Sequence, residues 1–284
     1  MNAYYDLALR VTERTEHIGH VALPLHTSRM TVASSGKAEA KVREAHEGGR
    51  RALSEALRRR AIDGVVEDTP VLGWYRVRRR IRGNPSISVI IPTRDKAELL
   101  ARCLDTLETS RYRPLQIIVV DNGSVEEATR TLLASRQIKV IRVDEPFNFS
   151  RLINVGAAAA SGDFLLLLNN DVEPINADWI EALLEHAQRE EVGVVGARLL
   201  YHDGTPQHEG MALVTRGGIP CHAVHLNWKG YLGLAHATTN CGAVTGACMM
   251  TRRSLFEALG GLDEDFRVAF GDVDYCFRIQ ERRL

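Results

Sequence analysis

GDFLLLLNND, residues 162–171, is the stretch that decides the fold. Its centre, residues 164–168, is short and wholly apolar, which is typical of a strand buried on both faces in a parallel sheet. The amide pair Asn169 and Asn170 and the carboxylate of Asp171 follow at the carboxyl end of that strand, where open parallel sheets bind ligands. On extended backbone Asn169 and Asp171 point the same way, so they are able to share a hard divalent cation with a diphosphate. The alternative is that these residues only end the strand as a turn.

Short apolar strands alternate with helical stretches on both sides of this run. We predict strands at 87–91, 116–120, 138–143, 164–168 and 192–199, and helices at 96–108, 125–135, 151–160 and 177–189. This alternation is typical of a mostly parallel α/β sheet with right-handed crossovers and helices on both faces. Thr93, Asp95 and Asp121 are then expected at the same ligand edge as Asp171.

The polar residues near this edge each have a structural alternative to ligand binding. Asp95 stands at a helix start, where a carboxylate commonly caps free N–H groups. Asp121 precedes the turn sequence 122–124, although its place after a buried strand suits a contact with a base or ribose. Asn148 or Ser150 is predicted to cap the helix that follows them. The residues alone leave both interpretations of the two carboxylates open.

The composition is that of a globular protein with one sizeable core and an appendage, or two small domains. Of 284 residues, 45% are hydrophobic and 25% charged, and the 36 Lys and Arg equal the 36 Asp and Glu in number. This balance gives no global field to attract nucleic acid, and the basic clusters at 58–60 and 76–82 are interpreted as solvated faces. No apolar stretch approaches the roughly 20 residues of a membrane helix, and no signal-sequence pattern opens the chain. We therefore predict a cytoplasmic protein without nucleic-acid partner or membrane span; peripheral membrane association is left open.

Cysteine and histidine residues show no metal-site spacing. The five cysteines, Cys103, Cys221, Cys241, Cys248 and Cys276, are interpreted as packing residues of a protein in a reduced compartment. His202, His208, His222, His225 and His236 are interpreted as surface or loop residues, because they lack regular ligand spacing. An oxygen-preferring ion at Asp171 therefore fits the sequence better than zinc.

Residues 1–84 differ in character from the rest of the chain. A charged helix is predicted over Ala38–Arg60, with Gly48 and Gly49 interrupting it at some cost in helicity. A short strand is predicted at 74–77, and glycine and proline residues punctuate the chain up to residue 85. We therefore place a helical linker over 36–84 and the main domain over 85–284.

Several blocks of sequence carry a family resemblance. They are VIIPTRD (89–95), IVVDNGS (118–124), NVG (154–156), ASGD (160–163), LNND (168–171), VTGAC (244–248), FEALGGLDE (256–264) and FGDVD (270–274). In order and spacing they resemble the motifs of family 2 glycosyltransferases with the GT-A fold, closest to the rhamnosyltransferase-like or cell-surface polysaccharide branch. The resemblance covers about residues 86–284 and implies a Rossmann-like, mostly parallel sheet flanked by helices.

The resemblance implies a role for each residue at the ligand edge. The donor-binding residues are then Pro92, Thr93, Asp95, Asp121, Asn169 and Asn170, with the first three lining the pocket for the nucleotide base. Asp171 ends the family's Asp-x-Asp element and would hold Mn²⁺ or Mg²⁺ against the donor diphosphate. Asp272 falls on the catalytic base, which takes the proton from an acceptor hydroxyl in a single inverting displacement. Asp274 would orient the site or bind the acceptor. Helix capping is the alternative role for both Asp272 and Asp274. The run 242–247 would border the acceptor.

The chain departs from the family pattern in three places. Asn169 replaces the first carboxylate of the Asp-x-Asp element, and Ile153 stands where many relatives have a basic residue. The chain also ends before the strand that, in the family, brings a histidine to the metal. Residues 1–35 resemble the closing segment of another such domain, with His26 near the position of that histidine. We therefore predict a piece of a tandem glycosyltransferase, truncated at its C-terminus.

The sequence thus predicts an enzyme. We expect an inverting, metal-dependent glycosyltransferase that moves a sugar from a nucleoside-diphosphate donor to a hydroxyl of a glycan or lipid-linked acceptor in cell-surface polysaccharide synthesis. One alternative is a sugar-phosphate nucleotidylyltransferase, but that class usually has a glycine-rich phosphate loop after the first strand, and residues 92–96 contain no glycine. The other alternative is a catalytically incomplete module that binds a nucleotide-sugar without turnover.

Overall fold

The computed structural model describes residues 3–19, 21, 23, 36–216, 219–225 and 237–282. The chain divides into two compact units, Met1–Arg80 and Ile81–Leu284. The division falls close to residue 85, where the main domain was predicted to begin. It also places the predicted linker in one unit with the residues before it.

The first unit joins two helices to a β-hairpin. Helix α1 (Ala3–Thr12) packs against helix α2 (Gly36–Arg59), and β1 (Gly64–Asp68) pairs antiparallel with β2 (Tyr75–Arg79). The Arg59 side chain donates two hydrogen bonds of 2.8 Å to the Glu13 carboxylate. The predicted long helix and short strand are confirmed, whereas the sequence analysis missed β1.

Helix α2 runs through Gly48 and Gly49 without the predicted interruption. The ring of Tyr75 lies against Gly49, where a Cβ would overlap the ring. Tyr75 Oη donates a 2.6 Å hydrogen bond to the backbone carbonyl of His46, and the two rings stack with centroids 4.9 Å apart. The glycine therefore allows the hairpin to approach the helix closely, and this packing offsets its low helix propensity.

The second unit is built on a six-stranded sheet in the order β5-β4-β3-β6-β12-β7. Its strands are β3 (Ile87–Thr93), β4 (Leu115–Asp121), β5 (Lys139–Arg142), β6 (Phe164–Leu168), β7 (Val194–Gly196) and β12 (Cys248–Arg252). Only β12 is antiparallel to its neighbours, β6 and β7, while the other neighbouring strands are parallel. The predicted mostly parallel α/β sheet is therefore confirmed.

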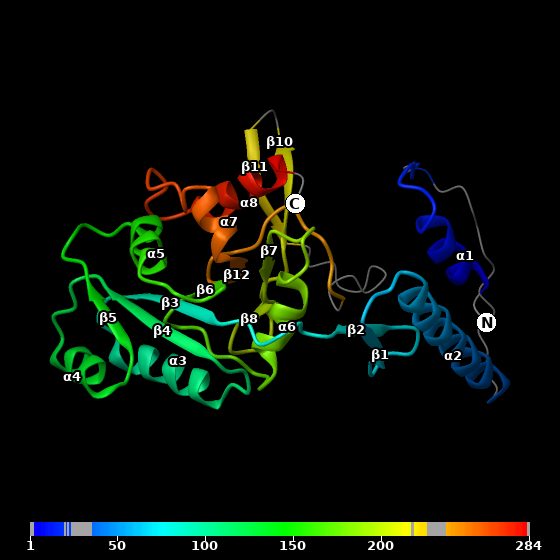
Figure 1. The fold of residues 1–284 in the computed structure, drawn as a ribbon, viewed down its shortest axis with the longest axis horizontal. Coiled ribbons are helices and arrows are strands. Elements are labelled where there is room, and N and C mark those ends of the chain that lie inside the picture. Colours follow the sequence, from blue (N-terminus) through cyan, green and yellow to red (C-terminus); the bar gives the residue numbers. More distant parts are fainter. Residues whose placement is uncertain are drawn as a thin grey trace. The chain divides into compact units, whose positions relative to one another are not determined.

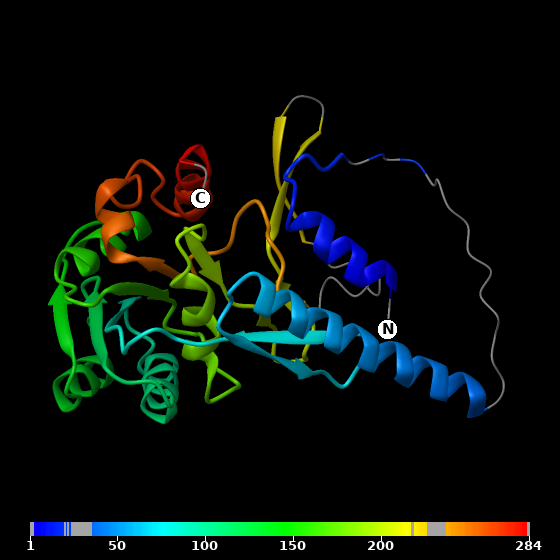
Figure 2. The ribbon, with the colours of Figure 1, turned by 45° about the vertical axis from the view of Figure 1, so that its right-hand side comes forward.

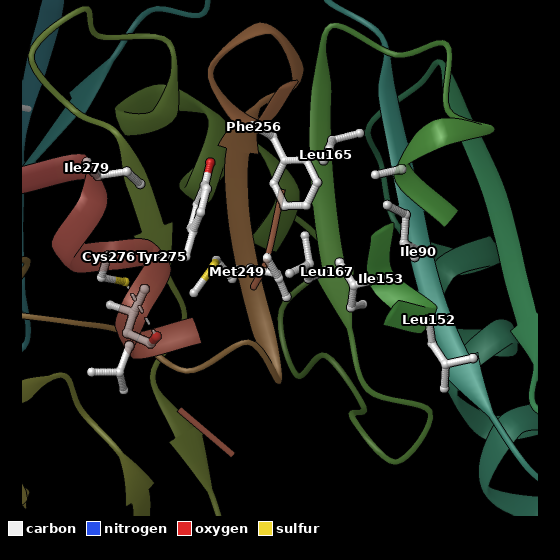
Figure 3. Close-up of a cluster of buried hydrophobic side chains, with 14 of the residues drawn as sticks. Ile90, Leu152, Ile153, Leu165, Leu167, Met249, Phe256, Tyr275, Cys276 and Ile279 are labelled. Atoms are coloured by element: carbon white, nitrogen blue, oxygen red, sulfur yellow. Dashed lines mark hydrogen bonds between the residues drawn. The ribbon is translucent and has the colours of Figure 1, made fainter. Parts of the chain in front are cut away.

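Helices cover both faces of this sheet (Figure 1). They are α3 (Ala97–Thr109), α4 (Glu127–Ser135), α5 (Phe149–Ala158), α6 (Trp179–Ala187), α7 (Arg253–Ala258) and α8 (Gly271–Glu281). Helices α3, α4 and α6 share a core with one set of strand residues, among them Val89 and Leu166. Helices α5, α7 and α8 pack on the alternate set, among them Ile90 and Leu167 (Figure 3). Because successive strand residues point to opposite faces, two apolar faces require the unbroken apolar runs seen in the sequence.

The region after β7 departs from the prediction of one strand over 192–199. The chain leaves the main sheet after the Ala197 N–H bonds to the Cys248 carbonyl at 3.2 Å. Strand β8 (Leu199–Leu200) instead pairs with β9 (Pro206–His208). Strands β10 (Met211–Arg216) and β11 (Ile219–His225) form a separate antiparallel ribbon that projects from the main sheet (Figure 2).

The buried cysteines agree with their predicted packing role. Cys103, Cys248 and Cys276 are buried and Cys241 is partly buried, all as free thiols. Burial raises the pKa of Cys103 and Cys276 to about 12, which keeps these thiols protonated and unreactive at neutral pH. The side chain of Cys221 lies outside the described residues. No helix in the described part of the chain is long and apolar enough to cross a membrane.

Candidate active site

The ends of β3 and β4 bring two predicted donor-binding residues together. Thr93 pairs in register with Asp121, and the Thr93 carbonyl accepts the N–H of Asn122 at 2.8 Å. The buried Thr93 hydroxyl in turn accepts a 2.9 Å hydrogen bond from the side-chain amide of Asn170. Pro92 precedes Thr93 in the same strand and is partly buried. The ends of β3, β4 and β6 are thus linked by hydrogen bonds, as expected for a shared ligand edge.

Both carboxylate oxygens of Asp121 have internal partners. Oδ1 accepts the backbone N–H of Ser124 at 2.9 Å, and Oδ2 accepts the guanidinium of Arg142 at 3.0 Å. The Asp121 side chain is 4% exposed, whereas that of Arg142 is 43% exposed. A buried carboxylate needs such partners to offset its desolvation. Asp121 therefore fixes the turn after β4 and holds a partly exposed guanidinium at the ligand edge.

Asp95 acts as a helix cap, but not for the helix that follows it. Its Oδ1 accepts the backbone N–H groups of Val125 and Glu126 at 2.8 and 2.9 Å, immediately before α4. These hydrogen bonds, chiefly the one from Glu126, lower the pKa of the Asp95 carboxyl. Asp95 itself has a φ of 55°, and its N–H bonds to the Ser124 hydroxyl at 2.7 Å. The capping alternative is therefore observed at α4 rather than at α3.

Asp171 is the exposed carboxylate of the edge. In the part of the chain that the structure describes, no side chain or backbone group forms a hydrogen bond or ion pair with its oxygens. Its neighbour Asn169 is held by a 2.9 Å hydrogen bond from its N–H to the Ala247 carbonyl, at the start of β12. Strand β6 ends at Leu168, and a turn closed by the Val172 N–H and the Asn169 carbonyl at 3.3 Å then presents the Asp171 carboxylate without an internal partner in the described residues, so the extended backbone expected over 169–171 is not observed.

The residues around Asp171 fit a hard divalent cation. The Asp171 carboxylate and the side-chain oxygens of Asn169 and Asn170 are the ligand type that Mg²⁺ and Mn²⁺ prefer. The Asn170 amide nitrogen donates to Thr93, which leaves its carbonyl oxygen as an acceptor. Among the described residues no group of three or more His, Cys, Asp and Glu could hold a metal. Such a site suits an ion held by one carboxylate together with the phosphates of a substrate rather than by an all-protein cage.

Asp272 lies in the first turn of α8, next to the start of β12. Its Oδ2 accepts the Gly246 N–H at 2.8 Å, and its Oδ1 accepts the N–H of Val273 at 2.9 Å. Asp274 lies two residues on but forms an ion pair with Arg278 at 2.7 Å. The two aspartates therefore differ: Asp272 is turned toward the loop at the sheet edge, and Asp274 is bound within its own helix.

A continuous series of contacts links the predicted site residues across the edge. Asp121 pairs with Thr93, which bonds to Asn170, and Asn169 bonds to Ala247. The next residue toward the N-terminus, Gly246, bonds to Asp272. The structure thus brings the carboxylates at 121, 171 and 272 to one edge of one sheet.

Other predicted residues lie away from this edge or in structural roles. Ile153 is fully buried in the core that α5 shares with the sheet. Asn148 caps α5 as predicted by accepting the Arg151 N–H at 3.0 Å, while Ser150 donates to the Phe266 carbonyl. Arg142 was not predicted, although its register with Asp121 on neighbouring strands was a usable signal.

The histidines form no common site in the described residues. His202 is exposed, whereas His208 is buried and its Nε2 accepts the Thr245 N–H at 3.3 Å. The interpretation as surface or loop residues is therefore wrong for His208, which supports the loop before β12. His26 and His236, and the side chains of His222 and His225, lie outside the described residues.

An open α/β sheet with polar side chains at its carboxyl edge is the architecture of many nucleotide-binding enzymes. Residues 88–260 match the family model described as glycosyl transferase family 2, and the chain belongs to this family. It is 38% identical over 292 residues to the O-antigen biosynthesis protein RfbC of Myxococcus xanthus, in a match that covers 99% of this chain and 22% of that protein.

A second relative and a solved structure are also similar to this chain. The uncharacterized protein y4gI of Sinorhizobium fredii is 38% identical over 290 residues, covering 97% of this chain and 32% of that protein. The chain thus spans less than a third of the length of either relative. The mannosyltransferase PcManGT from Pyrobaculum calidifontis, solved with GDP-Man and Mn²⁺, has a TM-score of 0.51 and 18% identity over 84% of this chain and 62% of that chain. This likeness confirms the predicted GT-A fold.

Proposed function

We propose that the chain is an inverting, metal-dependent glycosyltransferase domain that uses a nucleoside-diphosphate sugar. The observation that carries this proposal is the series of contacts from Asp121 to Asp272, with the exposed carboxylate of Asp171 between them at the same edge. Family membership supports the reaction class, and the PcManGT complex with GDP-Man and Mn²⁺ supports a nucleotide donor and a divalent ion. We place the donor over β3, β4 and β6, and the acceptor beside Asp272.

The donor-side residues position the nucleotide. Thr93 and Asp121 lie at adjacent strand ends, where Pro92 and Asp95 complete the predicted base pocket. The partly exposed guanidinium of Arg142 is a further donor contact of this chain. Asp171, with Asn169 and Asn170, would hold Mg²⁺ or Mn²⁺. When bound, the ion supplies Lewis-acid stabilisation of the negative charge that develops on the departing nucleoside diphosphate.

Asp272 is the proposed catalytic base. The Gly246 N–H fixes the orientation of the carboxylate, which then accepts the proton of an acceptor hydroxyl. The hydroxyl oxygen forms a bond to the anomeric carbon as the bond from that carbon to the diphosphate breaks. Attack from the face opposite the leaving group inverts the anomeric configuration.

The biological setting follows from the relative in Myxococcus xanthus. Its name places it in O-antigen biosynthesis, and we propose that this chain acts in cell-surface polysaccharide synthesis on a glycan or lipid-linked acceptor. We place that activity in the cytoplasm, where nucleotide sugars are the donors. The tandem arrangement suggested by residues 1–35 remains a prediction. It also remains a prediction that a histidine from outside the described residues binds the metal.

The test is release of nucleoside diphosphate from a panel of UDP-, GDP- and dTDP-sugars with Mn²⁺. We expect Asp272→Asn to lower release on the order of 10²–10⁴-fold, since a general base contributes about that much. Asp274→Asn is the matched control: it removes a carboxylate two residues away that is already paired with Arg278, and release should stay within a few-fold of wild type. Nuclear magnetic resonance of the product should show the anomeric configuration inverted.

Three results would count against the proposal. Nucleotide binding without any release that depends on Asp272 would identify a catalytically silent binding module instead. Retention of configuration would exclude the single displacement. Full activity in the presence of a chelator would exclude the metal.

A further inference from the structure

A cavity lies beside the edge strand β7, on the far side of β12 from the predicted donor-binding strands β3, β4 and β6. It has a volume of about 670 Å³ and is bounded by β7, the residues after β9, the segment 237–244 and the end of α8. This size falls within the range of about 300–1,000 Å³ that is typical of small-molecule sites. No residue assigned above to the donor, the metal or the base lines it.

The cavity extends along β7, from Glu191 before the strand to Arg198 after its carboxyl end. In β12, Met249 pairs with Leu167 of β6 on one side and Gly196 of β7 on the other, so β6 and β7 end level with each other. Arg198, which lines the cavity, follows the end of β7 as Asn169 follows that of β6. Two strand spacings separate β7 from β6, which is roughly 10 Å. The cavity therefore lies within reach of a ligand that also touches the catalytic edge.

One stretch of backbone separates the cavity from Asp272. Residues 242–244 line the cavity, and the next N–H, that of Thr245, bonds to His208 on the cavity side at 3.3 Å. The N–H of Gly246 then bonds to Asp272 on the other side. Because one short segment contacts both, a ligand in the cavity would lie next to the attacking hydroxyl.

Glu209 has an unusual environment in this cavity. Its side chain is 4% exposed, and its Oε1 accepts a 2.6 Å hydrogen bond from Arg198 Nε. Its Oε2 is buried without a hydrogen-bond partner among the described residues. An unsatisfied buried carboxylate oxygen is costly, so it calls for a donor from a bound molecule. The Arg198 side chain is 42% exposed and uses only its Nε in the bond to Glu209, so it adds N–H donors beside this acceptor.

The charges around the cavity balance, which favours a neutral ligand. Arg198 pairs with Glu209, and Arg189 pairs with Glu191 at 2.7 Å. The Glu209 carboxylate would repel a diphosphate, and the cavity has no excess of positive charge to offset that repulsion. A sugar hydroxyl, in contrast, is able to donate to Glu209 and to accept from Arg198 at once. Alternating acceptor and donor groups are therefore suited to the vicinal hydroxyls of a saccharide.

We infer that this cavity binds a sugar unit of the acceptor glycan, with Glu209 and Arg198 as specificity-determining residues. The identification of the sugar as acceptor rests on the proposed function. Glu209 accepts hydrogen bonds from a pair of sugar hydroxyls. Arg198 holds the Glu209 carboxylate in place and donates to the same hydroxyls. The acceptor then extends from the cavity past residues 242–246 to present its reacting hydroxyl to Asp272.

The test uses the purified chain and the methyl glycosides of glucose, galactose, mannose and N-acetylglucosamine as probes. Saturation-transfer nuclear magnetic resonance measures their binding to the wild type and three variants. Glu209→Gln replaces the unpaired acceptor with an amide donor and should weaken binding at least tenfold. Thr239→Trp fills the cavity from an exposed lining position and should abolish binding without changing the Arg198–Glu209 pair. Glu257→Gln, which breaks an exposed Arg–Glu pair on α7, should bind as the wild type does.

The outcomes separate this inference from the proposed function. Binding of UDP or GDP with Mn²⁺, but of none of the glycosides, would overturn the sugar site and leave the glycosyltransferase proposal standing. Glycoside binding that both Glu209→Gln and Thr239→Trp leave unchanged would also overturn the site. Glycoside binding that both variants remove, in a chain that binds no nucleotide, would support the sugar site and contradict the proposed function. Thermal unfolding of each variant distinguishes lost binding from lost folding, and Thr239→Trp still decides the matter if Glu209→Gln unfolds.

Discussion

Asp121 ends β4 and Asp171 follows β6, two strands on either side of β3 in the same sheet, yet their surroundings are opposite. Asp121 is buried, and each of its oxygens accepts a hydrogen bond from the protein. Asp171 is exposed, and no group in the described ranges binds its oxygens. One carboxylate therefore supports the site, and the other is left for a ligand.

The comparison extends to the other two aspartates of the site. Asp95 fixes the backbone before α4, and Asp272 accepts one N–H from Gly246 in the neighbouring loop and one from Val273, the next residue in its own helix. Position at a strand end therefore does not by itself identify a catalytic group, because the same position also suits a loop anchor. Burial and the kind of partner separate the two roles: Asp121 is buried and paired with a guanidinium, whereas Asp272 is half-buried and accepts only backbone N–H groups, which leaves lone pairs for a substrate.

Between Asp121 and Asp171, the larger expected effect on activity is that of removing the free carboxylate. Asp171→Asn should lower Mn²⁺-dependent nucleoside diphosphate release by on the order of 10²–10³, since Lewis-acid stabilisation contributes several kcal/mol. The free energy of unfolding should change by less than about 0.5 kcal/mol, as for a surface substitution that breaks no contact. Enzyme assays over a range of Mn²⁺ concentrations and urea denaturation measure the two effects.

Glu173→Gln is the matched control for that variant. It removes an exposed carboxylate two residues away that pairs with Arg102 at 2.7 Å. Its Mn²⁺ dependence should equal that of the wild type. Equal losses in the two variants would show that general negative charge, and not a ligand at Asp171, supports the activity.

A smaller effect is expected from disturbing the loop that orients Asp272. A Cβ at Gly246 would lie 3.3 Å from the Phe149 ring and 3.4 Å from the Asp272 Cβ, and valine adds two further methyl groups. Gly246→Val should therefore shift Asp272 and lower kcat roughly 10- to 100-fold, because small displacements of a reacting group are costly. The affinity for UDP or GDP with Mn²⁺ should change less than kcat does. A variant with normal kcat would show that the Gly246–Asp272 contact has no catalytic role.

For Asp121, whose carboxylate oxygens both accept hydrogen bonds from the protein, the main effect is expected in the free energy of unfolding. Asp121→Asn removes the charge that pairs with Arg142 and should lower the free energy of unfolding by about 1.5–3 kcal/mol, the usual range for a hydrogen bond to a charged group. Urea denaturation of this variant beside Asp171→Asn tests the comparison directly. Equal stability of the two variants would contradict the division into supporting and free carboxylates.

Sequence reasoning succeeded where one local pattern decides the structure. The run at 164–168 becomes β6 with the predicted bounds, because five consecutive apolar residues fit only a position buried on both faces. The sheet edge was also predictable, because parallel strands place their carboxyl ends together. The division of residues 192–199 between β7 and β8 could not be predicted, since it depends on pairing with β12 and β9, which are distant in the sequence.

The candidate site shows the same limit at the level of single residues. The sequence named Asp95 as a cap or a ligand, but the N–H groups it caps belong to residues 125 and 126, about 30 positions away. The cavity beside Glu209 depends on segments from residue 186 to residue 280, and no motif marks it. Local sequence patterns thus predict which residues lie at the carboxyl edge of the sheet, whereas long-range packing determines which groups they bind.

The smallest expected effect concerns Asp95 and depends on pH. The folded chain lowers the pKa of this carboxyl chiefly through the Glu126 N–H, so the charged form stabilises the fold. That contribution is complete above the pKa of an unfolded aspartate, about 3.9, and is lost as the pH falls through the lower folded value. Asp95→Asn keeps an acceptor oxygen but no charge. Its melting temperature should therefore lie below that of the wild type at pH 7, and the difference should narrow below about pH 4. Thermal unfolding between pH 3 and 7 tests this, and a difference of constant size would show that the two N–H groups do not depend on the charge of Asp95.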